Sequence, residues 1–422
     1  MNNIELLSKI LKSTNALIQS KEYKEAYKIG NSFSRKRMLS FSNSIYFICS
    51  ALRKSISTEI TDFIEEHTNL KFPDISRQAF SKARQNISPE AFKELCKLIV
   101  DTFYSSNIKL KKWYGFNILA IDGTALQIPD TIENLEQFGG KENQSNIKTA
   151  LATGSAIYDV LNDIIIDSTI STYPPKERKL AIDHINSITN KKLLDTSIVI
   201  FDRGYPSYEM FSFLDQKGIF FLMRAPSYFK ITESVDSNDF IINYRFKKVT
   251  RKLRIVKVGL PDGKVEVLVT NIPNETITPI MFKELYFLRW GIESKYRELK
   301  SSIEIEEFSG IKPIVIKQDF YASIYLSMIT ALLKKEADIA IANKDEHKNL
   351  KSQYQANRNF ILSRVVKNII TMLTRPLISR RIIDKILEKA EKIRSQIRHN
   401  RTYERKVKHQ RKKHHPQRKS CI

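Results

Sequence analysis

Two short apolar runs in this 422-residue chain each deliver an aspartate at their end. Residues 117–122 read Asn-Ile-Leu-Ala-Ile-Asp, and residues 197–202 read Ser-Ile-Val-Ile-Phe-Asp. Continuous apolar runs of this length indicate strands that are buried on both faces. The sequence therefore predicts a sheet that holds Asp122 and Asp202 at the exits of buried strands.

A third acid, Glu293, lies in a helical pattern farther along the chain. At about 100° per residue, four polar residues fall within an arc of about 60°: Tyr286, Arg289, Glu293 and Lys300. Apolar residues form a stripe about 90° away: Leu285, Leu288, Ile292, Leu299 and Ile303. One helix edge would place a carboxylate beside two cations and a phenol, which suits a metal and a phosphate held together. The alternatives are a solvated helix side for Arg289 and Lys300, a rim position for Tyr286 and a core position for Trp290.

The run Tyr286-x2-Arg289-x3-Glu293-x6-Lys300 resembles the signature of the insertion-sequence DDE transposases that share a YREK motif. The similarity covers residues 117–303 and includes two further segments: Asp122-Gly123-Thr124, followed by Pro129, Phe138 and Gly139, and Asp202-Arg203-Gly204-Tyr205. The resemblance implies an RNase H-like fold in which Asp122, Asp202 and Glu293 form a catalytic, metal-binding triad. It also implies that Tyr286, Arg289 and Lys300 grip the terminal phosphate of a transposon end.

Three carboxylates suit the chemistry of phosphodiester cleavage. Two divalent ions about 3.5–4 Å apart activate the attacking oxygen and stabilise the leaving oxygen when hard oxygen ligands hold them. Carboxylates favour Mg²⁺ or Mn²⁺, and no histidine lies within 15 residues of the three acids, so zinc is not expected. We expect Asp122 to bridge two ions, Asp202 to complete one site and Glu293 to complete the other.

Each acid also has an ordinary structural interpretation. Asp122 would form an Asp-Gly turn, and Asp202 would cap a helix or pair with Arg203. Glu293 would pair with Arg289, four residues earlier on a solvated helix. The three acids together, at the spacing of the motif, favour the functional interpretation.

The order of the predicted elements is that of an α/β, RNase H-like mixed-sheet core. Three antiparallel strands, a helix, a strand, a helix and a strand are expected at 117–128, 150–158, 164–172, 176–189, 198–201, 206–217 and 219–223. A β-rich insertion at 225–277 follows, with a strand at 229–232 and a Pro-Asp-Gly turn at 261–263 among its parts. The last core helix is expected to begin at Thr278-Pro279.

Four regions are predicted from this pattern. They are a helical DNA-binding domain at 1–110, the catalytic core at 111–310, a helical C-terminal region at 311–397 and a basic, disordered tail at 398–422. In the first, a short basic helix at 74–85 carries Arg77, Lys82 and Arg84 and is suited to a DNA groove. The alternative is a helical bundle with a solvated basic face.

The charge of the chain favours a polyanionic partner. Lys and Arg number 70 against 46 Asp and Glu, giving a formal net charge of +24. Residues 398–419 alone hold ten Lys or Arg, one Glu and four His. No Cys or carboxylate framework accompanies these histidines, so we expect the tail to add phosphate affinity and to bind no metal.

No apolar stretch approaches about 18 residues, so no transmembrane helix is expected. The N-terminal segment has an amphipathic helical pattern, unlike a signal peptide. The three cysteines have no metal-like spacing. These features fit a cytoplasmic protein that acts at the nucleoid.

The sequence thus predicts a transposase that cuts transposon ends and joins them to target DNA, working as at least a homodimer because two ends must be paired. Two alternatives stay open. One is a metal nuclease of the same fold without strand transfer, and the other is a non-catalytic DNA-binding protein.

Overall fold

The computed structural model describes residues 2–397 except 35–38, 51–54, 143–147, 227–236, 260–262, 264, 274, 347–349 and 351. The chain forms two compact units. The first comprises Met1–Ile108, Leu126–Ala152 and Leu299–Ile422, and the second comprises Lys109–Ala125 and Thr153–Glu298. The predicted N-terminal domain and the predicted C-terminal region both contribute helices to the first unit. The basic tail lies outside the described residues.

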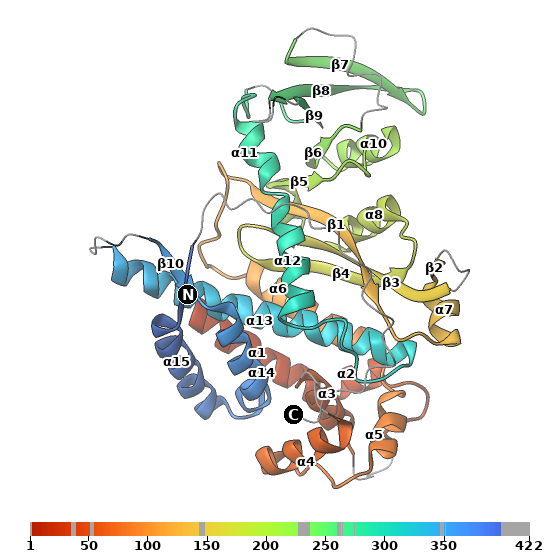
Figure 1. Ribbon diagram of the computed structural model, residues 1–422, viewed down its shortest axis with the longest axis vertical. Coiled ribbons are helices and arrows are strands. Elements are labelled where there is room, and N and C mark those ends of the chain that lie inside the picture. The colour runs from red at the N-terminus through yellow and green to blue at the C-terminus, as the bar shows by residue number, and fades with distance from the viewer. Residues whose placement is uncertain are drawn as a thin grey trace. The chain divides into compact units, whose positions relative to one another are not determined.

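One mixed sheet contains nine strands of the described chain (Figure 1). They are β1 (Asn117–Gln127), β2 (Gly140–Glu142), β3 (Lys148–Asp159), β4 (Ile164–Thr172), β5 (Ser197–Phe201), β6 (Phe220–Arg224), β7 (Asp239–Phe246), β8 (Val249–Gly259) and β9 (Val265–Thr270). The order is β2-β3-β1-β5-β6-β9-β8-β7, with β4 beside β3. β5 is parallel to both β1 and β6. The prediction of a mixed α/β fold is confirmed, as are the predicted core strands.

The helices of the second unit lie between these strands and after them. They are α8 (Glu177–Ser187), α9 (Lys191–Asp195), α10 (Tyr208–Gln216), α11 (Met281–Phe287) and α12 (Trp290–Ser301), whose last residues belong to the first unit. All five residues of β5 are buried, because this strand has a neighbour on each side and apolar packing on both faces.

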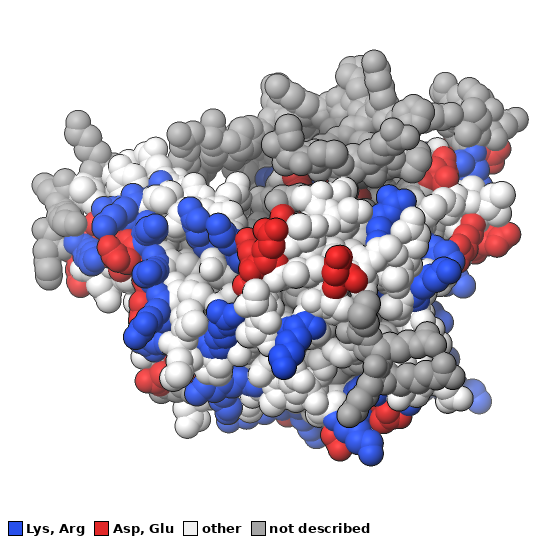
Figure 2. All heavy atoms as spheres, turned by 90° about the horizontal axis from the view of Figure 1, so that it is seen from below, with Lys and Arg blue, Asp and Glu red and all other residues white. Residues whose placement is uncertain are grey.

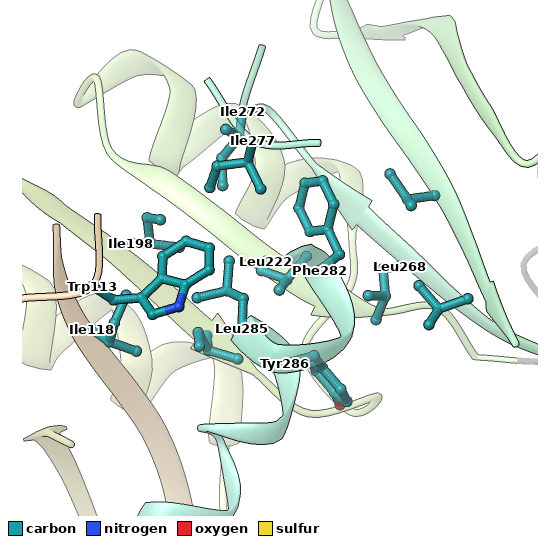
Figure 3. Close-up of a cluster of buried hydrophobic side chains, with 13 residues drawn as sticks. Trp113, Ile118, Ile198, Leu222, Leu268, Ile272, Ile277, Phe282, Leu285 and Tyr286 are labelled. Atoms are coloured by element: carbon teal, nitrogen blue, oxygen red, sulfur yellow. The ribbon is translucent and has the colours of Figure 1, made fainter. Parts of the chain in front are cut away.

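Buried apolar side chains join the sheet to α11 (Figure 3). Ile118 of β1, Ile198 of β5 and Leu222 of β6 belong to one cluster with Phe282 and Leu285 of α11. Full burial of each such side chain contributes about 1.5–3 kcal/mol. The cluster therefore fixes α11 against the strands that carry the predicted acids.

The predicted insertion continues the same sheet. β9 pairs antiparallel with β6, and β8 and β7 follow in antiparallel order. Arg254 of β8 is buried and contacts both carboxylate oxygens of Asp239 at 2.8 Å. It also donates to the carbonyl of Ile277 at 2.7 Å, in the segment that leads into α11. The predicted strand at 229–232 and most of the 261–263 turn lie outside the described residues.

The first unit is largely helical. Its elements are α1 (Asn3–Gln19), α2 (Lys21–Tyr27), α3 (Phe41–Cys49), α4 (Ile56–Glu66), the 3₁₀ turn Thr68–Leu70, α5 (Arg77–Arg84), α6 (Glu90–Tyr104), α7 (Ile132–Phe138), α13 (Pro313–Asp345), α14 (Arg358–Thr374), α15 (Pro376–Lys392) and the strand pair β10 (Tyr354–Ala356) and β11 (Arg394–Gln396). α13 is buried without interruption from Phe320 to Leu333, because it packs against α1, α3, α6, α14 and α15. Within the described chain, no helix has the length and apolar character needed to cross a membrane.

Charged side chains cover the surface of the protein unevenly. Figure 2 shows Lys and Arg spread over one face, with fewer Asp and Glu among them. On α5, Arg77 and Lys82 are exposed, as a DNA-binding role requires. Arg84 is only 2% exposed, so its predicted place on a DNA-binding face is wrong.

Arg84 instead connects α5 to α13 inside the first unit. Its guanidinium contacts Asp319 Oδ1 at 2.9 Å, Gln318 Oε1 at 2.9 Å and Ser309 Oγ at 2.6 Å. Gln318 returns two hydrogen bonds to the carbonyls of Arg84 and Ile87. This network satisfies a buried charge on all sides.

Replacing Arg84 by Met should destabilise this region by about 3–5 kcal/mol, because the partly buried Asp319 would lose its cation. Arg380→Met removes an exposed pair with Asp384 and should cost about 0.5 kcal/mol or less. Hydrogen exchange of the α5 and α13 amides measures both effects in this unit. Equal loss of protection in the two variants would contradict the assignment.

Candidate active site

The parallel pairing of β1 with β5 brings the first two predicted acids to equivalent positions. Asn117 pairs with Ser197 and Ala120 with Ile200, a constant offset of 80 residues (197 − 117 = 80). The same offset aligns Asp122 with Asp202. The two acids are therefore neighbours at the point where β5 ends, although β1 continues beyond Asp122 to Gln127.

Asp122 is partly buried near the other two acids. Its Oδ1 accepts a hydrogen bond from the Gly123 N–H at 2.8 Å. Burial raises the pKa of the Asp122 carboxyl to about 6, against the opposing effects of the Gly123 N–H and the Arg289 cation. Asp202 and Glu293 raise this pKa further. The three predicted acids thus act on one another electrostatically, as members of one site do.

Glu293 stands on α12 and pairs with Arg289. Arg289 Nη2 lies 2.7 Å from Glu293 Oε1, and the arginine side chain is 6% exposed. The contact is the four-residue pair of the structural alternative, but its arginine is buried and its glutamate is only partly exposed. The Arg289 guanidinium carbon also lies 5.7 Å from the ring centroid of Tyr286 and 4.8 Å from that of Trp290. Trp290 is 39% exposed, so the alternative of a core position does not hold for it.

Three buried polar atoms in this cluster have no hydrogen-bond partner within the described chain. They are Arg289 Nε, Arg289 Nη1 and the Tyr286 hydroxyl. Burial raises the pKa of Tyr286, so the phenol keeps its proton and remains a donor. Each unmatched buried donor costs about 1–3 kcal/mol. Such a cluster is suited to an oxygen-rich ligand.

The prediction of one continuous helix through the third acid is wrong at residues 288–289. α11 ends at Phe287 and α12 begins at Trp290. The N–H groups of Leu288 and Arg289 bond to carbonyls three residues earlier, at 3.2 and 3.1 Å. The calculated arc therefore does not hold for Tyr286 relative to the residues of α12. The buried stripe is confirmed at Leu285, Ile292, Leu299 and Ile303.

Lys300 lies near the end of α12, in the part assigned to the first unit. Its Nζ is 3.2 Å from Glu306 Oε1, and its side chain is partly exposed. The structure therefore pairs the last residue of the motif with a carboxylate that the sequence analysis did not include.

Two further carboxylates near Asp202 also escaped the sequence analysis. Glu177 is the first residue of α8, and Glu266 is on β9 beside Arg224, at 3.1 Å. Burial raises the pKa of both, and the charge of Asp202 adds to the increase. Neither has a spacing that relates it to the motif, because folding alone brings α8 and β9 to this edge.

The donor chemistry of the three acids fits a hard divalent cation. Burial is the main cause of the raised pKa of Asp122, and a divalent cation would relieve the repulsion from Asp202 and Glu293 that adds to it. In the described part of the chain, no group of three or more His, Cys, Asp or Glu side chains stands close enough to hold a metal ion. The charge of Glu293 is balanced by its ion pair with Arg289.

The geometry thus defines an α/β domain in which two acids come from neighbouring parallel strands and a third comes from a later helix. Residues 113–329 match the family described as the transposase DDE domain. The match spans 217 of 422 residues (329 − 113 + 1 = 217), so the chain belongs to this family.

Individual relatives are distant. InsZ of Escherichia coli K12 is 24% identical over 146 residues, 34% of this chain and 47% of InsZ. The transposase InsG for insertion sequence element IS4, from the same organism, is 22% identical over 275 residues, 59% of each chain. The chain therefore matches only about half the length of these relatives. A piggyBac transposase synaptic complex with hairpin DNA gives a TM-score of 0.44 at 11% identity, covering 91% of this chain and 81% of that one.

Asp122→Asn should stabilise the metal-free protein at neutral pH. The folded pKa of about 6 exceeds the unfolded value of about 3.9, so Asp122 destabilises the fold increasingly as pH rises from 4 to 6 and by a constant amount above. We expect a gain of about 1–3 kcal/mol at pH 8 that vanishes near pH 4.

Thermal unfolding in a chelator at pH 4, 6 and 8 measures this dependence. Asp183→Asn on the exposed side of α8 is the control and should be neutral throughout. A gain for Asp122→Asn that is the same at every pH would contradict the assigned cause.

Proposed function

We propose that this protein is a transposase that cuts DNA at the ends of a mobile element and joins the freed ends to a target. The observation that carries the proposal is the register of β1 and β5, which aligns Asp122 with Asp202 beside Glu293. Membership of the transposase DDE domain family supports it. The name of InsG, a transposase for an insertion sequence element, favours the same type of element here.

We further propose that the core is RNase H-like. The strand order β4-β3-β1-β5-β6, with β5 parallel to both of its neighbours, supports this assignment. Helix α8, followed by the short helix α9, precedes β5, and α10 precedes β6, in the order that such a core requires. The inserted strands β7–β9 then extend its far edge.

The triad would hold Mg²⁺ or Mn²⁺, as two ions, through Asp122, Asp202 and Glu293. When bound, the ions stabilise the attacking and leaving oxygens of the phosphodiester. Arg289 would neutralise Glu293 until that acid is needed as a ligand, which limits repulsion in the free protein.

We also propose, from the spacing of Tyr286, Arg289, Glu293 and Lys300, that the chain belongs to the YREK-signature subgroup. In our proposal, the unmatched donors of Arg289 and the Tyr286 hydroxyl bind the terminal phosphate of the transposon end. Lys300 would contribute a point charge after leaving Glu306. Burial strengthens such contacts because little water competes for them.

DNA recognition is assigned to the N-terminal region 1–110, with exposed Arg77 and Lys82 of α5 as contacts. The tail at 398–422 would add sequence-independent affinity. Two copies of the chain are needed to pair two ends, and the complex would form in the cytoplasm at the nucleoid. Inverted repeats on both sides of the gene would separate this function from that of a nuclease without strand transfer.

Asp122→Asn, Asp202→Asn and Glu293→Gln should each abolish cleavage of the element's ends in Mg²⁺, because each keeps the side-chain size and removes a ligand charge. Binding of the ends should stay near wild type. A gel assay of cleavage and binding on one end substrate measures both, with Asp183→Asn as the control acid. Wild-type turnover in any of the three variants, or full activity in EDTA, would refute the triad.

Arg289→Ala should lower cleavage far more than binding. One lost phosphate contact changes the slope of log affinity against log salt by about one unit, whereas a misplacement of about 1 Å can cost ~100-fold in rate. Lys283→Ala, on the exposed side of α11, should change neither rate nor slope appreciably. Removal of residues 398–422 should weaken all DNA binding and flatten the salt dependence. If Arg289→Ala lowered binding and cleavage by the same factor, Arg289 would be an ordinary part of the basic surface.

A further inference from the structure

The main-chain carbonyl of Asp122 lies within reach of two hydroxyl groups. Tyr296 Oη donates to it at 2.7 Å, and Ser155 Oγ lies 3.4 Å from it. Tyr296 is on α12, three residues after Glu293, and Ser155 is on β3. The strand that carries the first acid is therefore bonded directly to the helix that carries the third.

The two distances make Tyr296 the principal donor. A hydroxyl bond of 3.4 Å is long, whereas 2.7 Å is its normal length. Ser155 Oγ also lies 3.0 Å from His184 Nε2, so Asp122 is not its only partner.

The Tyr296 hydroxyl has a second main-chain partner. The main-chain N–H of Ala156, on β3, hydrogen bonds to it. A phenol that accepts one bond and donates one has a defined direction. The hydroxyl thus joins three elements, namely β1, β3 and α12, at the level of Asp122.

We propose that Tyr296 is a positioning residue, whose hydroxyl sets the separation between Asp122 and Glu293. It acts through the main chain of Asp122 and touches neither metal nor DNA. The inference rests on the proposed function, because this separation matters only if both acids bind the same pair of ions. Without the hydroxyl, α12 and β1 would still pack, but no hydrogen bond from Tyr296 would fix the position of one relative to the other.

The proposal is tested by titrating the full chain with Mn²⁺ and measuring the concentration of the free ion from its electron paramagnetic resonance signal. Tyr296→Phe deletes one oxygen and should weaken Mn²⁺ binding and slow cleavage about 10-fold or more, as loss of an outer-shell partner does. Binding of DNA ends should not change. Ser155→Ala should weaken Mn²⁺ binding about twofold or less, because its bond is long.

Tyr23→Phe is the matched control. The Tyr23 hydroxyl donates to the main-chain carbonyl of Ala91 at the same 2.7 Å, inside the first unit. Its loss should lower the melting temperature and leave Mn²⁺ affinity unchanged. This comparison separates the general effect of losing a buried hydrogen bond from a specific effect on the positions of the metal-binding acids.

Three results would overturn the proposal. They are wild-type Mn²⁺ affinity in folded Tyr296→Phe, a larger loss in Ser155→Ala than in Tyr296→Phe, and failure of Tyr296→Phe to fold, which would assign the hydroxyl to the fold. Failure of the proposed function has a different signature, since Mn²⁺ binding would then also be insensitive to Asp122→Asn and Glu293→Gln.

Discussion

The parallel pairing of β1 with β5 is the constraint on which the candidate site depends. Parallel neighbours run toward the same edge of a sheet, so acids at equivalent positions are adjacent however far apart they lie in the sequence. The pairing requires a long connection, and β3, β4 and α8 supply it. The observed register matters, because a slip of one residue would move Asp202 away from Asp122.

Elements that follow from local pattern were predictable, and those that follow from tertiary packing were not. The apolar runs before Asp122 and Asp202 identified both strands, because a strand that is buried on both faces is apolar at nearly every position. No such local pattern indicates the break between α11 and α12 at Leu288–Arg289. A Cβ at Gly291 would lie 2.5 Å from Val160 Cγ1, so the close approach of α12 to the chain after β3 depends on a glycine whose partner the sequence does not reveal. Glu177 and Glu266 were missed for the same reason.

Unmatched buried polar atoms gather at the site, whereas elsewhere in the described chain they occur one to a residue. Arg84 and Arg254 are buried with partners for their guanidinium groups, whereas Arg289 is buried with two nitrogens unmatched. Asp122 is placed where burial and two like charges oppose its ionisation. Such local conflicts reduce stability and are typical of sites that a ligand completes. Arg289 therefore differs from Arg84 and Arg254 in having two buried donors that a ligand could use.

The insertion between the second and third acids has a structural role in this arrangement. β9 joins the sheet at β6, and β8 places Arg254 where it binds the carbonyl groups of Ile272, Pro273 and Ile277. Those carbonyls lie in the segment that enters α11, so the insertion fixes the start of the helix that carries Tyr286. Phe282 stacks under the same guanidinium at 5.0 Å and packs into the apolar cluster of the sheet. The position of Tyr286 and Arg289 is therefore set from the insertion side by Arg254, and that of Glu293 from the β1 side by Tyr296.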